Sequence, residues 1–114
     1  MVDSTGLCVF TTFAWTLEDI APQVDAACEG DWTPENMALV GERIWNMERD
    51  FNIAAGMTAE DDTLPDRLLK DAAKTGPAKG KVNNLGEMLP KYYEIRGWSP
   101  DGVPTDETRQ RLGL

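Results

Sequence analysis

Residues 33–56 read TPENMALVGERIWNMERDFNIAAG, and this stretch decides the fold class. Residues 33–35 combine a capping hydroxyl, a proline at the first helical position and an acid in the first turn. Apolar side chains then recur at spacings of three and four residues: Met37, Val40, Ile44, Met47 and Phe51. This period predicts one helix from about Pro34 to Ile53, closed by Gly56, with the apolar stripe packed into the core.

Shorter helices are expected on both sides of this segment, because capping residues, prolines and glycines mark their ends. They run from Thr16 to Gly30, Leu64 to Leu69, Leu85 to Gly97 and Asp106 to about Leu112. Pro22 must lie in the first turn of its helix or kink it, and Pro90 strains the interior of another. On that helix five residues are predicted to share one face: Leu85, Met88, Leu89, Tyr92 and Ile95.

The segments between these helices are expected to be irregular. Residues 1–13 indicate an extended or tightly turning stretch, residues 58–62 a capped turn and residues 75–84 a loop. No run of β-branched residues alternates with polar ones, so no strand is predicted. The expected fold is all-α, an irregular bundle of about four or five helices with long loops and no significant sheet.

The composition limits the chemistry of the chain. Its 114 residues suit one domain, and they include two cysteines and no histidine. Without histidine, the chain has no Ser-His or Cys-His nucleophile and no histidine-based zinc site. Two cysteines fill neither a four-cysteine zinc site nor an iron–sulfur site. Difficult chemistry by this chain alone is therefore not expected.

Charge and hydropathy exclude several partners. The net charge is −9, and residues 1–42 hold eight acidic and no basic side chains. Such a surface repels phosphate backbones, so nucleic acid is not an expected partner; a solvated face or a docking patch for a basic partner both fit. No apolar run is long enough to span a membrane, and no basic region precedes an apolar stretch as in a signal peptide. A cytoplasmic location is expected.

Three small constellations could carry chemistry. Cys8, beside Gly6, could present a thiolate to an iron–sulfur cluster or serve as a small buried apolar residue. Residues 79–81, Lys-Gly-Lys, suit either an anion site or a solvated loop, and Asp61 and Asp62 suit either a cation or a turn cap. Cys28 is interpreted as structural, and a single Cys8–Cys28 disulfide stays open.

The order of several motifs resembles one known family. DSTGLC at residues 3–8 resembles the Asp-x-x-Gly-Leu-Cys motif of the tungsten-dependent aldehyde:ferredoxin oxidoreductases. The resemblance continues through GERIW, ERDFN, DDTLPDRL, GPAKG and RGW, at residues 41–45, 48–52, 61–68, 76–80 and 96–98. It covers essentially the whole chain, and the ending at residues 112–114 is similar to the carboxyl terminus of that family.

The resemblance implies that residues 1–114 are the C-terminal, third, helical domain of a longer enzyme. That enzyme would hold a tungsten bis-pterin and one [4Fe–4S] cluster. By position in the motif, Asp3 would bind a pterin ring, Cys8 would be the fourth cluster ligand, and Gly6 and Leu7 would bring backbone groups close to the cofactor. The other three cluster cysteines would lie upstream, so the isolated chain is expected to bind neither group and to be inactive.

The implied activity is oxidation of aldehydes to carboxylates, with electrons passed to ferredoxin. The implied partners are the upstream domains and ferredoxin; an exposed apolar segment at residues 7–13 would favour homodimers. Two alternatives remain open, a stand-alone helical interaction module without redox activity and a family member that reduces carboxylic acids or aromatic thioesters. The sequence does not choose the substrate, or tungsten against molybdenum.

Overall fold

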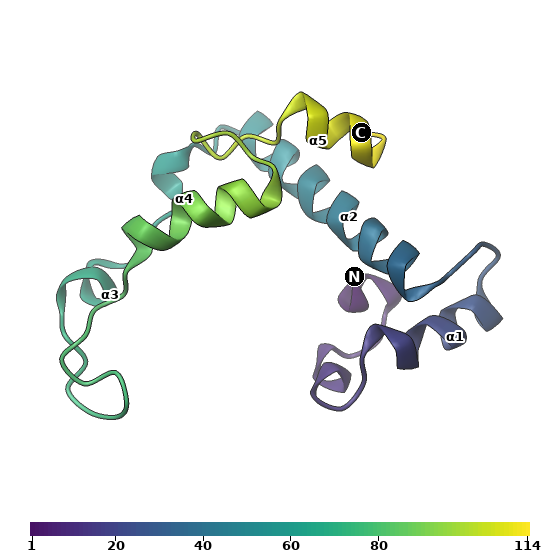
Figure 1. Cartoon of the computed structure of the whole chain (residues 1–114), viewed down its shortest axis with the longest axis horizontal. Coiled ribbons are helices and arrows are strands. Elements are labelled where there is room, and N and C mark those ends of the chain that lie inside the picture. The colour runs from purple at the N-terminus through teal and green to yellow at the C-terminus, as the bar shows by residue number, and fades with distance from the viewer. The chain divides into compact units, whose positions relative to one another are not determined.

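The computed structural model describes all 114 residues and contains helices, turns and loops. The chain has five α-helices, which are labelled in Figure 1: α1 Leu17–Ala27, α2 Pro34–Ala54, α3 Asp66–Lys70, α4 Leu85–Arg96 and α5 Asp106–Leu112. Three short 3₁₀ helices accompany them: η1 Val2–Thr5, η2 Val9–Phe13 and η3 Ala59–Asp61. The single β-bridge joins Trp98 and Pro104, and there is no strand. The all-α prediction is confirmed.

The ends of α1 at Thr16 and of α4 at Gly97 fall where local signals predicted them, whereas α1 stops at Ala27, before Gly30, and α3 begins at Asp66 rather than Leu64. Thr16 caps α1, and its backbone N–H donates to the Asp19 carboxylate at 2.9 Å. The hydrogen bond from the Thr16 side chain lowers the pKa of the Glu18 carboxyl in the same first turn. Gly97 ends α4 with φ 68°, a left-handed conformation that glycine adopts without steric cost. Residues 1–13 turn tightly as η1 and η2 rather than extending.

Pro22 lies inside α1, beyond its first turn, and Pro90 lies inside α4. A proline removes one backbone donor from the helical hydrogen-bond ladder. In α1 the side chain of Gln23 donates to the Asp19 carbonyl at 2.9 Å, which adds a hydrogen bond beside the proline. Both helices continue through their prolines, so the first-turn alternative for Pro22 does not hold.

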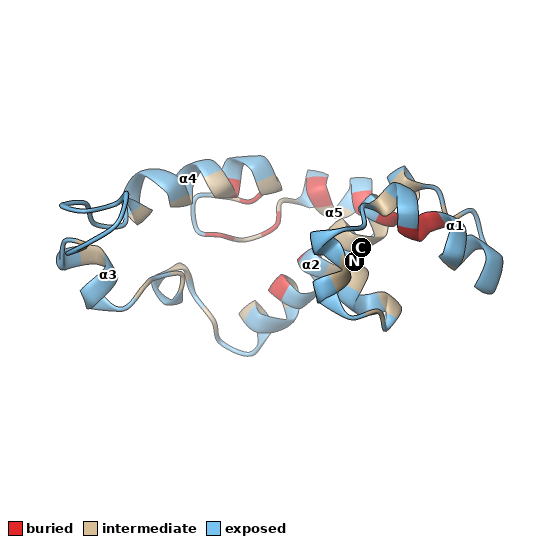
Figure 2. Cartoon of the chain, turned by 90° about the horizontal axis from the view of Figure 1, so that it is seen from below, coloured by how far each residue is buried: buried red, intermediate tan, exposed pale blue.

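The chain forms two compact units, and the division falls within α2 and within α5. The first unit contains residues 1–49 and 109–114, and the second contains residues 50–108. The core of the first unit is small: Ile20, Ala21 and Met37 are buried, and Met1, Val2, Leu7, Leu17, Val24 and Trp32 pack against them. Figure 2 shows how few residues of the chain are buried.

The predicted apolar stripe of α2 is only partly buried. Met37 is fully buried, whereas Met47 and Phe51 are 56% and 73% exposed. The buried residues near the middle of α2 are polar, namely Asn46 and Arg49. The Asn46 side-chain amide donates to the Glu42 carbonyl at 2.9 Å, so its burial leaves that group hydrogen-bonded. The expectation that the whole stripe forms core is therefore wrong at its carboxyl-terminal half.

The second unit is organised around aromatic rings. Tyr93 and Trp98 are buried, with ring centroids 5.9 Å apart, and Tyr92 meets Trp98 edge-to-face at 5.6 Å. The Tyr93 hydroxyl donates to the Asp62 carboxylate. Of the predicted face of α4, Leu85, Leu89 and Tyr92 are partly buried, whereas Met88 and Ile95 are exposed. The fully buried residue of this helix is Tyr93, which contacts Trp98 and lies outside the predicted face.

None of the helices is long and apolar enough to cross a membrane. The longest, α2, carries acidic and basic side chains along its length.

Candidate functional site

The predicted cofactor-contacting residues lie in one tight turn at the amino terminus. Asp3 belongs to η1, Gly6 ends η1 with φ 79°, and Cys8 precedes η2. An ordinary side chain would have open space at Gly6, since a Cβ there meets nothing within 4 Å. Backbone conformation rather than crowding therefore favours glycine at this position. We name residues 3–8 the Asp3–Cys8 turn.

Hydrogen bonds inside the Asp3–Cys8 turn fix its shape. The Gly6 N–H donates to the Asp3 carbonyl at 3.2 Å, and the Leu7 N–H donates to the Thr5 hydroxyl oxygen at 3.3 Å. The Thr5 hydroxyl donates to the Val2 carbonyl at 2.7 Å. Because the Gly6 and Leu7 amides already have acceptors, backbone contacts from these residues to a ligand are expected to use carbonyl oxygens.

Hydrogen bonds hold the backbone around Cys8 in place, whereas the Cys8 side chain is exposed. Its carbonyl accepts hydrogen bonds from the Thr11 backbone at 2.9 Å and the Thr11 hydroxyl at 2.8 Å. Cys8 is a free, exposed cysteine, as is Cys28 at the end of α1. The interpretation of Cys8 as a small buried apolar residue is therefore wrong, and no Cys8–Cys28 disulfide forms. The Asp3 side chain is also exposed.

The turn rests on the core of the first unit. Met1, Val2 and Leu7 pack against Ile20, Ala21 and Met37. A Cβ at Gly41 of α2 would lie 2.9 Å from the Met1 Cβ, so the amino terminus approaches the helix backbone closely. These contacts anchor the base of the Asp3–Cys8 turn, and the acidic and thiol side chains are left facing away from that core.

The chain's own donors do not complete a metal site. No group of three or more histidine, cysteine, aspartate or glutamate side chains is arranged to hold a metal ion. Asp61 caps η3 by accepting from the Thr58 N–H at 2.8 Å, and Asp62 accepts from Tyr93. The capping alternative for Asp61 therefore holds. Cys8 fits a cluster only as one ligand among several, because a [4Fe–4S] cluster requires four.

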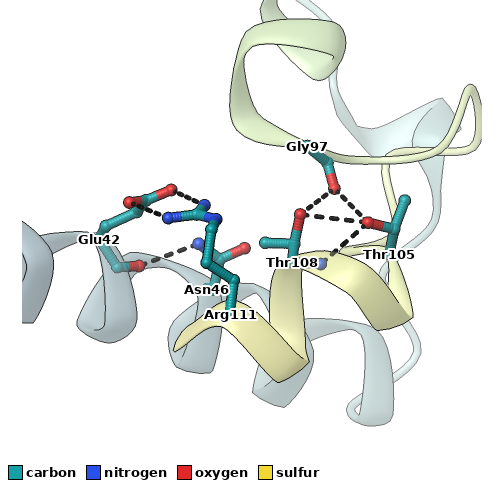
Figure 3. A network of polar contacts seen from close by, with 6 residues as sticks. All are labelled: Glu42, Asn46, Gly97, Thr105, Thr108 and Arg111. Atoms are coloured by element: carbon teal, nitrogen blue, oxygen red, sulfur yellow. Dashed lines mark hydrogen bonds and ion pairs between the residues drawn. The ribbon is translucent and has the colours of Figure 1, made fainter. Parts of the chain in front are cut away.

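Two groups of polar contacts hold the carboxyl-terminal segments, and each group lies within one unit (Figure 3). The Gly97 carbonyl accepts from the Thr105 and Thr108 hydroxyls at 3.0 and 2.8 Å, and from the Thr105 backbone at 3.1 Å. In the other unit, the Arg111 guanidinium binds the Glu42 carboxylate through two contacts of 2.5 and 3.0 Å. These contacts have a structural role and involve none of the predicted cofactor residues.

Sequence reasoning missed a hollow of about 380 Å³ in the second unit. Its lining is mostly apolar and includes Leu89, Pro90, Tyr93, Trp98 and one carboxylate, Glu94. The aromatic residues on either side of Gly97 were the available signal. Their packing depends on the left-handed turn at Gly97, and helix periodicity alone did not reveal it.

Comparison with known proteins assigns the chain to a class of oxidoreductases. A model of the family described as aldehyde ferredoxin oxidoreductase, domains 2 and 3, matches residues 1–114. The chain is 47% identical to the tungsten-containing aldehyde ferredoxin oxidoreductase of Pyrococcus furiosus and 45% identical to that of Thermococcus kodakarensis, over its whole length. The chain belongs to the aldehyde ferredoxin oxidoreductase family.

The relatives are much longer than this chain. It spans 19% of the length of each of these two enzymes. A more distant relative, 30% identical over 98% of the chain, is the aliphatic sulfonate oxidoreductase, WOR-like subunit, of Pyrococcus furiosus, of which the chain again spans 19%. The same helical region therefore occurs in oxidoreductases that are named for different substrates.

Proposed function

We propose that residues 1–114 act as the C-terminal, third, helical domain of a longer oxidoreductase. The longer enzyme would oxidise aldehydes to carboxylates and pass the electrons to ferredoxin. The observation that carries the proposal is the Asp3–Cys8 turn, which holds its backbone by internal hydrogen bonds and exposes one carboxylate and one thiol. The identity to aldehyde enzymes over the whole chain supports the choice of reaction.

Two cofactors would supply the redox chemistry in that enzyme. A tungsten bis-pterin would carry out the two-electron oxidation, and a [4Fe–4S] cluster would pass the electrons on singly. The domain would contribute positions for both groups, and the upstream domains would contribute the three remaining cluster ligands. Alone, the domain supplies too few ligands for a cluster and is expected to be inactive.

Each residue of the turn has a proposed role that suits its chemistry. Cys8 would bind one iron, because a thiolate is the ligand that iron–sulfur clusters prefer. Asp3 would accept hydrogen bonds from pterin N–H groups, since an ionised carboxylate only accepts. The carbonyl oxygens of Gly6 and Leu7 would accept in the same way, because their amides donate within the turn. The packed Leu7 side chain would hold these acceptors in place.

The aldehyde assignment rests on sequence identity rather than on a substrate-binding residue in this chain. The aldehyde enzymes are 44–47% identical to the chain, whereas the aliphatic sulfonate relative is 30% identical. We therefore propose aldehydes as the substrate class. Reduction of carboxylic acids is the reverse of the same chemistry, and the direction of catalysis depends on the potentials of the full enzyme and its partner.

A paired cysteine replacement in the longer enzyme tests the proposal. We expect Cys8→Ser to lose most of the cluster iron and the ferredoxin-coupled oxidation of aldehyde, because a serine hydroxyl is a poor ligand for the cluster. Cys28→Ser is the matched control, since Cys28 is also exposed but lies at the end of α1. The measurements are iron per protein and aldehyde-dependent reduction of ferredoxin. Unchanged iron content in Cys8→Ser would refute the role given to Cys8.

A further inference from the structure

The charge of the chain is reversed over one segment. Residues 67–84, which we name the basic loop, contain five basic side chains and one acidic one, a formal charge of +4. The rest of the chain therefore carries −13, since the whole chain is −9. All six charged side chains of the basic loop are exposed. Lys70 is paired with Asp66 at 2.7 Å on α3, whereas Lys74, Lys79 and Lys81 form no ion pair.

Backbone hydrogen bonds give the basic loop a defined shape. The Ala73 N–H donates to the Lys81 carbonyl at 2.9 Å, and the Gly80 N–H donates to the Ala73 carbonyl at 2.8 Å. Gly80 has φ 82°, which permits the turn that brings Lys79 and Lys81 back toward residue 73. The lysines are thus presented on a closed turn, which reduces the entropy lost when a partner binds.

The basic loop also carries two exposed apolar side chains, Leu68 and Val82. The Asn83 N–H donates to the Leu68 carbonyl at 2.8 Å, which pairs the backbone that follows Val82 with the backbone of Leu68. Leu68 and Val82 are 43% and 46% exposed, although both are aliphatic. Protein interfaces combine apolar contact area with polar and charged groups, and we call Leu68 and Val82 the apolar centre of the loop. The basic loop therefore offers a contact area as well as charge.

The chemistry of the loop favours an acidic protein over other polyanions. Residues 67–84 contain no aromatic side chain, whereas single-stranded nucleic acids and membrane interfaces are usually bound with aromatic residues. The charge of −13 elsewhere would oppose an extended polyanion or an anionic bilayer. A compact partner is repelled less than an extended polyanion, because at physiological salt charges act over only about 8 Å. A compact acidic protein can therefore contact the basic loop without approaching the acidic remainder of the chain.

We propose that the basic loop is a docking surface for a compact acidic protein. Resting on the proposed function, we assign this partner as the ferredoxin-type electron acceptor of the longer enzyme. The loop lysines would pair with carboxylates of the acceptor, and Leu68 and Val82 would contact an apolar residue between them. The acidic remainder of the chain would repel the acceptor from other faces, and so would orient it during encounter.

The first experiment uses the 114-residue chain and needs no cofactor. A ferredoxin of net negative charge is titrated into the chain by calorimetry at low and at physiological salt. We expect the double charge reversal Lys79→Glu/Lys81→Glu to weaken binding by about tenfold or more. The control is Arg43→Glu/Lys91→Glu, which changes the net charge equally at exposed positions outside the loop and should change affinity by less than about twofold. Circular dichroism checks that both variants stay helical.

The outcomes separate the alternatives. Equal weakening in both variants would overturn the docking surface, because net charge alone would then explain binding. Lack of ferredoxin binding would overturn it as well, as would tighter binding to phosphatidylserine vesicles or to duplex DNA than to ferredoxin. Loss of binding in Leu68→Ser/Val82→Ser, with the lysines intact, would support the apolar centre.

A second experiment distinguishes this proposal from the proposed function. In the longer enzyme, Lys79→Glu/Lys81→Glu should raise the KM for ferredoxin about tenfold and leave aldehyde oxidation with a small viologen dye unchanged. An unchanged KM would overturn the docking surface and leave the proposed function intact. Absence of dye-coupled aldehyde oxidation in the unaltered enzyme would overturn the proposed function, and the calorimetric titration would then decide the docking surface.

Discussion

Residues 1–15 and residues 97–108 are both short segments that consist mainly of turns and short helical stretches, yet they use their side chains in opposite ways. In residues 97–108 one carbonyl, that of Gly97, accepts from two threonine hydroxyls and one amide, and Trp98 is buried. In residues 1–15 the threonine hydroxyls also bond locally, but Phe10 and Phe13 stack on each other at 5.8 Å and are 69% and 84% exposed.

The difference separates a segment that stabilises the fold from one that presents side chains. Closing residues 97–108 satisfies polar groups and buries an aromatic ring, and both effects favour the folded state. Residues 1–15 satisfy their backbone locally and expose apolar side chains to solvent, which gains little stability in this chain. The apolar side chains and Cys8 are thereby left exposed to solvent in this chain.

Of the substitutions considered, Gly97→Ala should destabilise residues 97–108 most. An added Cβ would lie 2.2 Å from the Thr108 Oγ1 atom, at a residue with φ 68°. Left-handed strain and overpacking each cost about 1–3 kcal/mol, so we expect a loss of about 2–6 kcal/mol in the free energy of unfolding. Urea denaturation followed by circular dichroism measures it.

Gly86→Ala is the matched control for that experiment. Gly86 lies in the first turn of α4, and a Cβ there meets nothing within 4 Å. Alanine is the better helix former, so this substitution should stabilise the chain by up to about 1 kcal/mol. If both substitutions changed the urea midpoint equally, the closed turn at Gly97 would have no special role in stability.

Threonine-to-valine substitutions compare the two segments directly. Thr108→Val removes a buried hydroxyl that donates to the Gly97 carbonyl, and should cost about 1 kcal/mol. Thr12→Val removes an exposed hydroxyl that donates to the Val9 carbonyl at 2.7 Å, and should change stability by less than about 0.5 kcal/mol. The same denaturation experiment measures both. A larger loss in Thr12→Val would contradict the division of roles.

Phe10→Ser/Phe13→Ser should have the smallest effect on stability. Both rings are largely exposed, so we expect a change within about 0.5 kcal/mol in the free energy of unfolding. Light scattering should show less self-association, because the exposed apolar area falls. Unfolding of the double variant would instead show that residues 1–15 contribute to the fold of this chain.

Helix positions could be predicted because their signals are local. Thr16, Pro34 and Gly97 mark helix ends through interactions with neighbouring residues, and each end lies where expected. The buried faces were harder to predict, because burial depends on what packs against a helix. Phe51 satisfies the apolar period of α2 and is exposed, whereas Tyr93 lies outside the predicted face of α4 and is buried.

The candidate site could be predicted as a set of residues but not as a geometry. Asp3 and Cys8 belong to one sequence motif, and the structure keeps them in one turn. The sequence did not reveal that the Gly6 and Leu7 amides are used within the turn, because this depends on the φ of Gly6 and on the Thr5 hydroxyl. The basic loop was visible only as Lys-Gly-Lys at residues 79–81, since its closure requires pairing with residue 73.

The buried polar residues of α2 affect which substitutions this sequence can accept during evolution. Asn46 is fully buried and Arg49 nearly so, whereas Met47 beside them is exposed. In a library of random substitutions of this chain, the apolar residue Met47 should therefore accept polar replacements. The polar residue Asn46 should reject apolar ones. Selection on a longer enzyme would instead restrict Met47 wherever another part of the protein covers it. Comparing the two patterns of tolerance would identify the contacts that this chain makes beyond itself.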